Sequence, residues 1–289
     1  IAEPDFGVLT NIGLAHIEGF KDIATVRKSK MELLDSVGLA AVNLDDEFLM
    51  EGVAVAVYQG RLLRFGLAEG ADIRATDVEP GKRDQRETAF RLHMPDGEVP
   101  VKLGLTGMFN VYNALAAASA TYMFGICAED IKEGLESFKG VPMRMELKDM
   151  RGYTIISDVY NANPSSMEEA VKELIRLKKA RAIAVLGDML ELGTYSETAH
   201  SRLGRWMADI GVDVFIAVGA EMRAAAREFS AAGKEAHVTD SAEEAGSIMR
   251  TMVHEDDTVL VKGSRSMRME DVLESNNTHA ANKEGGGGI

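Results

Sequence analysis

A polar turn between an apolar strand and an amphipathic helix, at residues 158–167, constrains the fold of this chain most. The preceding run 153–156 is short and apolar, as in a buried strand. Apolar residues then recur at helical spacing, at Met167, Ala170, Val171, Leu174 and Leu177. Pro164 suits the first helical position and Asn163 the N-cap before it. In an open parallel sheet such a turn is a place for ligands, because strand carboxyl ends and helix amino ends converge there. A turn that only caps its helix is the alternative.

Three more apolar runs end in glycine or polar residues, and helical patterns separate them. The runs are 182–186, 214–218 and 258–261, and the helical patterns cover about 165–179, 197–210, 220–232 and 241–253. This alternation predicts a parallel sheet with helices on both faces. We therefore expect a doubly wound, Rossmann-like α/β domain over 142–274. A hairpin of 145–148 and 153–156 should open it, and a disordered tail, 275–289, should follow it.

The amino-terminal part has a different pattern. Residues 1–43 read as strand, helix and strand, and short strands are predicted at 53–57, 62–65 and 88–92. Pro95-Asp96-Gly97 is a hairpin turn signal, which indicates an antiparallel β insertion in a parallel sheet. Helices are expected at about 110–124 and 129–137. The boundary is expected in 139–142, so that residues 1–141 form the first of two α/β domains.

Composition excludes some partners. The formal net charge is −14 and the pI is about 5.0, which argues against nucleic acid as a partner. The most apolar run, 115–127, is too short to span a membrane. The one cysteine, Cys127, fits a reducing cytoplasm and is expected to be a small core residue of a helix.

Five strings carry a family resemblance: TNIGLAHIE at 10–18, NVYNALAA at 110–117, DVYNANP at 158–164, GDMLELG at 187–193 and KGSR at 262–265. In this order and spacing they resemble the Mur ligases over about 1–272. Within that family they are most similar to the ligases that add D-alanyl-D-alanine to a UDP-N-acetylmuramoyl tripeptide in peptidoglycan precursor synthesis.

The resemblance implies a reaction. ATP phosphorylates the terminal carboxylate of the tripeptide, the amine of D-alanyl-D-alanine attacks the acyl phosphate, and phosphate leaves. ATP and Mg²⁺ are the implied cofactors, since such chemistry depends on positioning and on neutralising charge. Residues 1–141 would be the carboxy-terminal part of the central ATP-binding domain, and 142–274 the domain that binds the incoming dipeptide. We expect a cytoplasmic monomer.

The implied metal ligands are His16 and Lys30. His16 matches the family histidine that helps to hold magnesium; a hydrogen-bonded histidine at a strand end is the alternative. Lys30 falls on a helical stripe with Ile23, Val26, Leu33, Leu34 and Val37, where a charged amine is costly unless it is neutralised. The family's matching lysine is carbamylated, and a carbamate suits magnesium. A snorkelling lysine is the alternative to a carbamate at Lys30.

The resemblance also implies nucleotide contacts. Asn110 and Asn113 match residues near the adenine, although Asn110 would also serve as a helix cap. Arg144 matches an arginine that reaches the nucleotide phosphates, and an exposed linker arginine is the alternative. Asp158 matches an aspartate that approaches the ribose. With His16 and Lys30, Arg144 completes the predicted catalytic set.

The tripeptide or the dipeptide is expected to contact residues of the three carboxy-terminal strings. The predicted set is Tyr160, Asn161, Asn163, Asp188, Lys262, Ser264 and Arg265. Lys262 and Arg265 are expected to hold carboxylates, Arg265 with two parallel hydrogen bonds. Glu191 is a weaker candidate that would also suit a helix cap. His200 is expected to be a surface histidine or a histidine with satisfied hydrogen bonds.

Some features depart from the family pattern. The expected phosphate-binding loop is absent and would precede Ile1, so we expect a fragment that is inactive alone. Phe109 stands where the family often has histidine, and Ser157 and Val159 flank Asp158 in place of the usual residues.

Three other interpretations remain. One is another Mur-type or folylpolyglutamate-type amide ligase. The second is a dinucleotide-binding or protein-interaction domain on a doubly wound sheet, although no Gly-x-Gly-x-x-Gly follows a strand. The third is a catalytically dead nucleotide-binding remnant.

Overall fold

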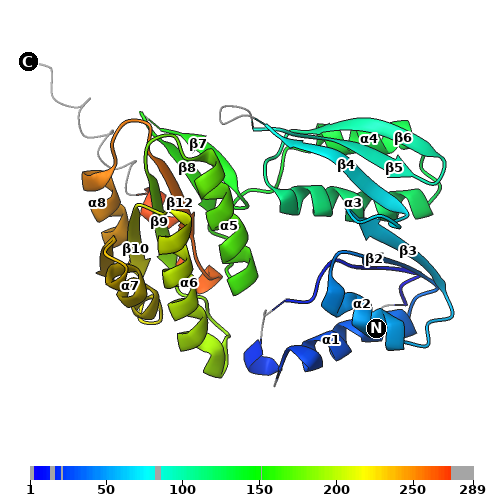
Figure 1. Ribbon diagram of the computed structural model, residues 1–289, viewed down its shortest axis with the longest axis horizontal. Coiled ribbons are helices and arrows are strands. Elements are labelled where there is room, and N and C mark those ends of the chain that lie inside the picture. The colour runs from blue at the N-terminus through cyan, green and yellow to red at the C-terminus, as the bar shows by residue number, and fades with distance from the viewer. Residues whose placement is uncertain (1–2, 14–16, 21, 82–85, 151, 275–289) are drawn as a thin grey trace, which may run out of the picture. The chain divides into compact units, whose positions relative to one another are not determined.

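The chain divides into two compact units. The computed structural model describes residues 3–13, 17–20, 22–81, 86–150 and 152–274. Unit 1 is Ile1–Gly140 and unit 2 is Val141–Ile289 (Figure 1). The division falls one residue before the boundary expected after residue 141. No helix in these described ranges is long and apolar enough to cross a membrane.

Unit 1 contains a six-stranded sheet in the order β1-β2-β3-β4-β5-β6. The strands are β1 (Phe6–Leu9), β2 (Leu39–Asn43), β3 (Arg61–Gly66), β4 (Ile73–Pro80), β5 (Thr88–Met94) and β6 (Gly97–Leu103). The first four pair in parallel, and β4, β5 and β6 pair antiparallel. The predicted parallel sheet with an antiparallel extension is therefore confirmed, including the hairpin between β5 and β6.

Two hydrophobic clusters cover the two faces of this sheet. The helices are α1 (Ile23–Met31), α2 (Glu47–Val55), α3 (Met108–Met123) and α4 (Ala128–Ser137), with 3-10 turns at Ile17–Gly19 and Glu32–Asp35. Side chains alternate across β2, so Ala41 packs in the cluster with α3, whereas Ala40 and Val42 pack with residues of α1 and α2.

Two predictions for unit 1 were wrong. Residues 53–57 do not form a strand, because Asp46 caps α2 by accepting a hydrogen bond from the Leu49 amide at 2.8 Å. Leu49 and Gly52 are buried at helical spacing, while Val57 is 87% exposed. Cys127 is not a core residue either: it is exposed and occupies the N-cap position of α4.

Unit 2 contains a second six-stranded sheet, in the order β11-β10-β9-β12-β8-β7. Its strands are β7 (Glu146–Asp149), β8 (Thr154–Asp158), β9 (Ala182–Gly187), β10 (Val214–Val218), β11 (Glu235–Thr239) and β12 (Thr258–Lys262). All neighbours are parallel except β7, which forms the predicted antiparallel hairpin with β8.

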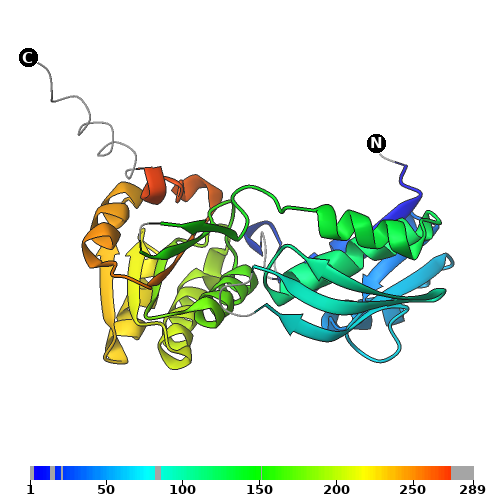
Figure 2. The same ribbon diagram turned by 90° about the horizontal axis from the view of Figure 1, so that it is seen from above.

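Helices lie on both faces of the sheet in unit 2 (Figure 2). They are α5 (Pro164–Leu177), α6 (Ser196–Ile210), α7 (Met222–Ala231), α8 (Ala242–Met252) and the short α9 (Asp271–Glu274). The connections through α5, α6 and α7 run toward β11, and the connection through α8 runs back to β12. Because such crossovers are right-handed, α8 lies on the opposite face from the other three. The predicted doubly wound domain is confirmed.

The close packing of α6 on α7 depends on Gly204. A Cβ atom at this position would overlap the backbone carbonyl of Ala225 in α7. We expect Gly204→Ala to lower the free energy of unfolding of unit 2 by about 1–3 kcal/mol, because the two helices must separate. Urea unfolding followed through Trp206, the single tryptophan and a residue of α6, measures this change.

Gly134→Ala is the control for that substitution. Gly134 lies inside α4, and nothing lies within 4 Å of a Cβ atom built there. Alanine should therefore be neutral or stabilising by up to about 1 kcal/mol, as measured by circular dichroism. Equal losses in the two variants would contradict the steric account of Gly204.

Candidate functional site

The carboxyl ends of β8, β12 and β9 form the candidate site of unit 2. These strands are neighbours in the sheet, and the chain leaves β8 and β9 toward one face and β12 toward the other (Figure 1). Ligands of open α/β sheets bind outside the strand carboxyl ends at such a switch point. The three strings at 158–164, 187–193 and 262–265 begin at these ends, so the fold brings together residues that lie about a hundred positions apart.

A buried ion pair joins two of these strand ends. The Lys262 Nζ atom lies 2.6 Å from the Asp158 Oδ2 atom and donates to the Asn161 carbonyl oxygen at 2.7 Å. Lys262 is only 1% exposed. Burial lowers the pKa of the Lys262 ammonium below its ordinary value, and the charge of Arg144 acts in the same direction, whereas Asp158 opposes both. Lys262 was expected to hold a substrate carboxylate; here it holds the carboxylate of Asp158.

The segment before β7 folds over this ion pair. The Met145 amide donates to Asp158 Oδ1 at 3.3 Å, and the Tyr160 amide donates to the Met143 carbonyl oxygen at 3.2 Å. Met143 and Met145 both have positive φ angles, of 65° and 46°, which is uncommon for residues other than glycine. The Arg144 guanidinium between them lies over the Tyr160 ring, 4.1 Å from its centroid. Arg144 and the 48% exposed Tyr160 thus present a cation and an aromatic ring to solvent.

The predicted cap of α5 is confirmed. The Asn163 side chain accepts from the Ser166 amide at 2.9 Å, the Ser166 hydroxyl group accepts from the Asn163 amide, and Pro164 is the first helical residue. The Asn161 Oδ1 atom accepts from the Ala162 amide at 2.9 Å. Both amide oxygens therefore hold the turn itself, as the capping alternative expected. Their contact with a substrate stays a prediction.

The loop after β9 is held to the ends of two other strands. The Leu190 amide donates to the Ser264 hydroxyl at 2.9 Å, and the Ser264 amide donates to the Asp188 carbonyl oxygen at 3.1 Å. The Asp188 side chain accepts from the Met222 amide at 2.7 Å, where α7 begins. Burial raises the pKa of the Asp188 carboxyl, and the amides of Met222 and Glu221 oppose that shift.

Asp188 and Ser264 were predicted to contact substrate, and this contact stays a prediction, while the structure shows that both residues also hold the loop. They are almost fully buried, and their polar groups bond within the loop and to α7. Gly219 makes room for the Asp188 carboxylate, since a Cβ atom there would overlap it and the φ angle is 106°. Glu191 is exposed with a φ angle of 62°, and α6 begins at Ser196, so it does not cap that helix.

Arg265 is exposed beside the same strand ends. It makes two hydrogen bonds to Glu270, at 2.8 and 2.6 Å, which raise the pKa of the guanidinium and lower that of the Glu270 carboxyl. The predicted two-point contact with a carboxylate is therefore present, but it is made to a carboxylate of this chain. A substrate carboxylate would have to compete with Glu270.

In unit 1 the structure corrects the position of Lys30. Lys30 is exposed, and its Nζ atom donates to the Asn11 carbonyl oxygen at 2.8 Å. The apolar residues of the predicted stripe do face the core, because Val26, Leu34 and Val37 are buried in one cluster with Ile23 and Leu33 packed against it. Only the burial of Lys30 was wrong, since its side chain leaves α1 toward solvent and the Asn11 carbonyl oxygen. Lys30 nevertheless reaches the loop that leaves β1. His16 lies outside the described residues.

The described residues contain no ready-made cluster of metal-ligating side chains. No group of three or more histidine, cysteine, aspartate or glutamate residues lies together in the described part of the chain. Lys30 as an ammonium is a cation and not a ligand, so it would contribute oxygen to a metal only as a carbamate.

The helix predicted to begin at about Asn110 begins two residues earlier in the structure. The α3 helix begins at Met108 with Gly107 as its N-cap, so Asn110 lies in the first turn. Its Nδ2 atom donates to the Thr106 carbonyl oxygen at 2.8 Å, and Asn113 lies 3.5 Å away on the next turn. Asn113 is exposed.

Sequence reasoning missed Asp45 at the end of β2. Its carboxylate accepts from the Leu67 and Ala68 amides and from the Tyr112 hydroxyl at 2.9 Å, which ties α3 to the loop between β3 and β4. The polar run 43–46 directly after an apolar strand was the available signal. It is the same signal that identified the turns of unit 2.

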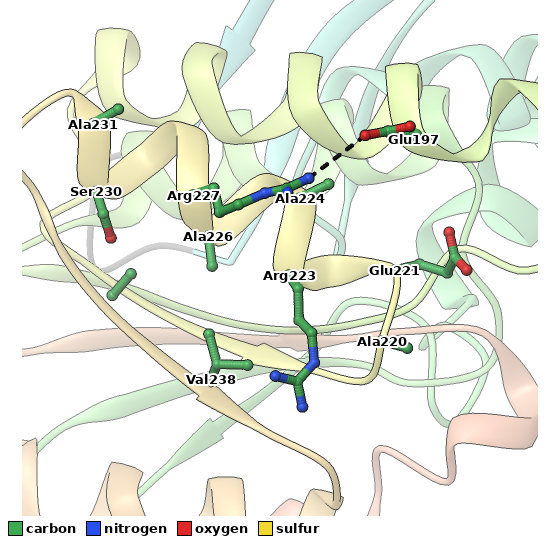
Figure 3. Close-up of a pocket in the computed structure, with 11 residues that line it drawn as sticks. Glu197, Ala220, Glu221, Arg223, Ala224, Ala226, Arg227, Ser230, Ala231 and Val238 are labelled. Carbon is green, nitrogen blue, oxygen red and sulfur yellow. Dashed lines mark ion pairs between the residues drawn. The ribbon is translucent and has the colours of Figure 1, made fainter.

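A surface cavity of about 950 Å³ lies elsewhere in unit 2, along α7 and β11 (Figure 3). Its lining includes Arg223, Arg227, Glu197, Glu221 and Val238, and none of the predicted site residues. Arg223 pairs with Asp240 and Arg227 with Glu197, so both guanidinium groups are already neutralised. The cavity thus contains none of the motif residues in its lining, although the amide of its Glu221 also bonds to the Asp188 side chain.

Comparison with known proteins agrees with this arrangement. Residues 1–121 match the Mur ligase middle domain, and residues 143–265 match the Mur ligase glutamate ligase domain. The UDP-N-acetylmuramoyl-tripeptide–D-alanyl-D-alanine ligase of Escherichia coli (strain K12) is 33% identical over 280 residues, which are 94% of this chain and 60% of that protein.

Two solved structures are similar over the whole fold. MurF from Acinetobacter baumannii is 31% identical with a TM-score of 0.84, covering 94% of this chain and 59% of that one. MurF ligase from Thermotoga maritima, in complex with ADP, is 27% identical with a TM-score of 0.82, covering 98% of this chain and 64% of that one. This chain thus spans about 60% of the length of the relatives that it matches. The chain belongs to the Mur ligase family, and its two units match that family's middle and carboxy-terminal domains.

Proposed function

We propose that this chain is part of an ATP-dependent ligase that joins D-alanyl-D-alanine to a UDP-N-acetylmuramoyl tripeptide through an acyl phosphate. The observation that carries the proposal is the convergence of three family strings at the carboxyl ends of β8, β12 and β9. The names of the Escherichia coli and Acinetobacter baumannii relatives support this substrate pair. The ADP bound to the Thermotoga maritima relative supports ATP as the nucleotide.

The residues of unit 2 suit a role in holding anionic groups. Arg144 is exposed and faces the Tyr160 ring, and it forms no ion pair with a carboxylate of the described residues, so it is available to meet a phosphate. Asp158 and Lys262 neutralise each other and fix the turn that carries Tyr160 and Asn161. The peptide part of the substrates would then contact Tyr160, Asn161 and Arg265. Asp158 would accept a hydrogen bond from a ribose hydroxyl only with a carboxylate lone pair that Lys262 and the Met145 amide do not use.

The residues of unit 1 would serve the nucleotide and its metal. Asn110 and Asn113 would lie near the adenine at the start of α3. Lys30 as a carbamate, with His16, would hold Mg²⁺, which would neutralise charge on the transferred phosphoryl group. The Lys30 ammonium donates to the carbonyl oxygen of Asn11, which precedes His16 by five residues in the same TNIGLAHIE string.

Release of ADP tests the proposed function directly. We expect ADP to form from ATP only when UDP-N-acetylmuramoyl tripeptide and D-alanyl-D-alanine are both present. The assay compares the 289-residue chain with the protein that includes any coding sequence preceding residue 1. Activity is expected only in the longer form, because no phosphate-binding loop is found in residues 1–289.

The second candidate is a neighbouring amide ligase that adds one amino acid. Single amino acids, including D-alanine, a diamino acid and glutamate, are the controls. ADP release with one of them in place of the dipeptide would replace the proposed substrate. No ADP release from the longer protein with any acceptor, despite ATP binding, would favour a catalytically dead remnant.

A further inference from the structure

A histidine inside unit 2 contacts the candidate site through the backbone. His200 lies in the first two turns of α6 and is 0% exposed. Its Nε2 atom lies 3.1 Å from the amide nitrogen of Met189, and its Nδ1 atom lies 2.8 Å from the carbonyl oxygen of Ser196. The ring therefore connects the start of α6 to the loop that leaves β9.

These two contacts determine the protonation state of the ring. A backbone amide only donates, so Nε2 has to accept and carries no proton. A carbonyl oxygen only accepts, so Nδ1 carries the proton. His200 is thus a neutral imidazole in one tautomer. A second proton on Nε2 would point at the Met189 amide inside the core, where no water can separate the two donors.

The Met189 amide lies at the centre of a loop that is attached to the rest of unit 2 on both sides of it. The next amide, of Leu190, bonds to Ser264, and Glu191 has the left-handed φ angle of 62°. The preceding Asp188 bonds to the start of α7 through its side chain. Loss of the His200 contact would free the centre of the loop between these two attachments.

We propose that neutral His200 is the positioning residue of the 188–192 loop, and that protonation of its ring releases this loop from the ends of β9 and β12. The proposal deepens the proposed function, since this loop borders the strand ends assigned to the peptide substrates. His200 itself touches no predicted substrate position.

The charged groups around the ring act in opposite directions. Asp188, from the loop, and Glu221, at the start of α7, favour the imidazolium, as does the Ser196 carbonyl oxygen. Glu221 also accepts a hydrogen bond from the Ser196 hydroxyl at 2.6 Å. Burial is the largest effect and lowers the pKa of His200 below its ordinary value of 6.5.

The direction of the pH effect follows from that shift. An unfolded or released ring takes up a proton near pH 6.5, whereas the buried ring does so only at lower pH. The stabilisation from neutral His200 is therefore complete above pH 6.5 and decreases as the pH falls below it. At a given acidic pH the loop should open before the strands do.

Amide hydrogen exchange of the 289-residue chain tests this. We expect protection of the Met189 and Leu190 amides, corrected for intrinsic exchange, to fall about tenfold for each pH unit below 6.5. Amides inside β9 and β10 should stay far better protected than these two at each pH, because they exchange only when the sheet itself opens. His200→Gln supplies an amide oxygen in place of Nε2 and does not titrate, so protection in this variant should lose its pH dependence.

His237→Gln is the matched control. His237 lies in β11 at the surface of the same unit, 3.1 Å from Glu235. It should keep the wild-type pH response. The same slope in His200→Gln as in the wild type would overturn the proposal.

A spectroscopic measurement on the wild type needs no variant. Imidazole nitrogen shifts should show a proton on Nδ1 and none on Nε2 at pH 7.5. A proton on Nε2, or a charged ring at that pH, would also overturn the proposal. Neither measurement depends on ligase turnover, so failure of the proposed function would leave this inference intact, and the reverse also holds.

Discussion

Lys262→Met should lower the free energy of unfolding of unit 2 by about 3–5 kcal/mol. The substitution removes the ammonium that lies 2.6 Å from Asp158 and leaves that carboxylate buried without its counter-charge. It also frees the Asn161 carbonyl oxygen, so the turn that carries Tyr160 should loosen. Urea unfolding followed by Trp206 fluorescence measures the loss in unit 2 alone.

Two further variants distinguish the stability lost with the ion pair from the stability lost by changing the size and shape of the side chain. Asp158→Asn combined with Lys262→Met removes both charges and should recover part of the lost stability, because no buried charge remains. Arg265→Met breaks an exposed pair with Glu270 and should change stability little. If Lys262→Met were no less stable than Arg265→Met, the ion pair would not hold the strand ends together.

Lys30→Ala should reduce ligase turnover by at least about 100-fold in a protein that is extended by any coding sequence preceding residue 1. Under the proposed function, alanine removes the carbamate oxygen that would hold the metal near the transferred phosphoryl group. Formate or acetate should restore part of the activity by supplying a carboxylate. ADP formation at saturating substrates is the measurement.

Lys28→Ala is the matched control for Lys30→Ala, since Lys28 is an exposed lysine of the same helix. It should leave turnover unchanged. A carbamate signal from ¹³C-labelled carbon dioxide should be present in the Lys28→Ala protein and absent from the Lys30→Ala protein. Full turnover in Lys30→Ala would show that Lys30 only tethers the Asn11 carbonyl oxygen.

The carboxy-terminal fold was predictable because buried parallel strands are continuous apolar runs. All six residues of β9 and all five of β10 are buried, so each strand is identified without knowledge of its neighbours. The strands β4 and β11 were missed because charged residues interrupt them. Their strand conformation depends on pairing with a neighbour, which a local pattern does not contain.

The candidate site was predictable in place but not in its contacts. The polar turns lie at the strand ends where they were expected. However, Asp158 and Lys262 are 104 positions apart, and only the parallel register of β8 with β12 makes them partners. Asp188 likewise caps α7 because β10 lies beside β9. Residue type identified the groups that matter, and strand order determined what each one binds.

The terminal position of β11 has a consequence for self-association. One side of this strand bears no neighbouring strand within the described part of the chain, so its backbone could serve as a template for another copy. Glu235 and His237 point from the same face of the strand, and Lys234 and Asp240 flank it. These charges would have to lose water before a second β11 could align, which favours dispersed molecules over fibres. Neutral residues at 234 and 235 should therefore increase aggregation at high concentration.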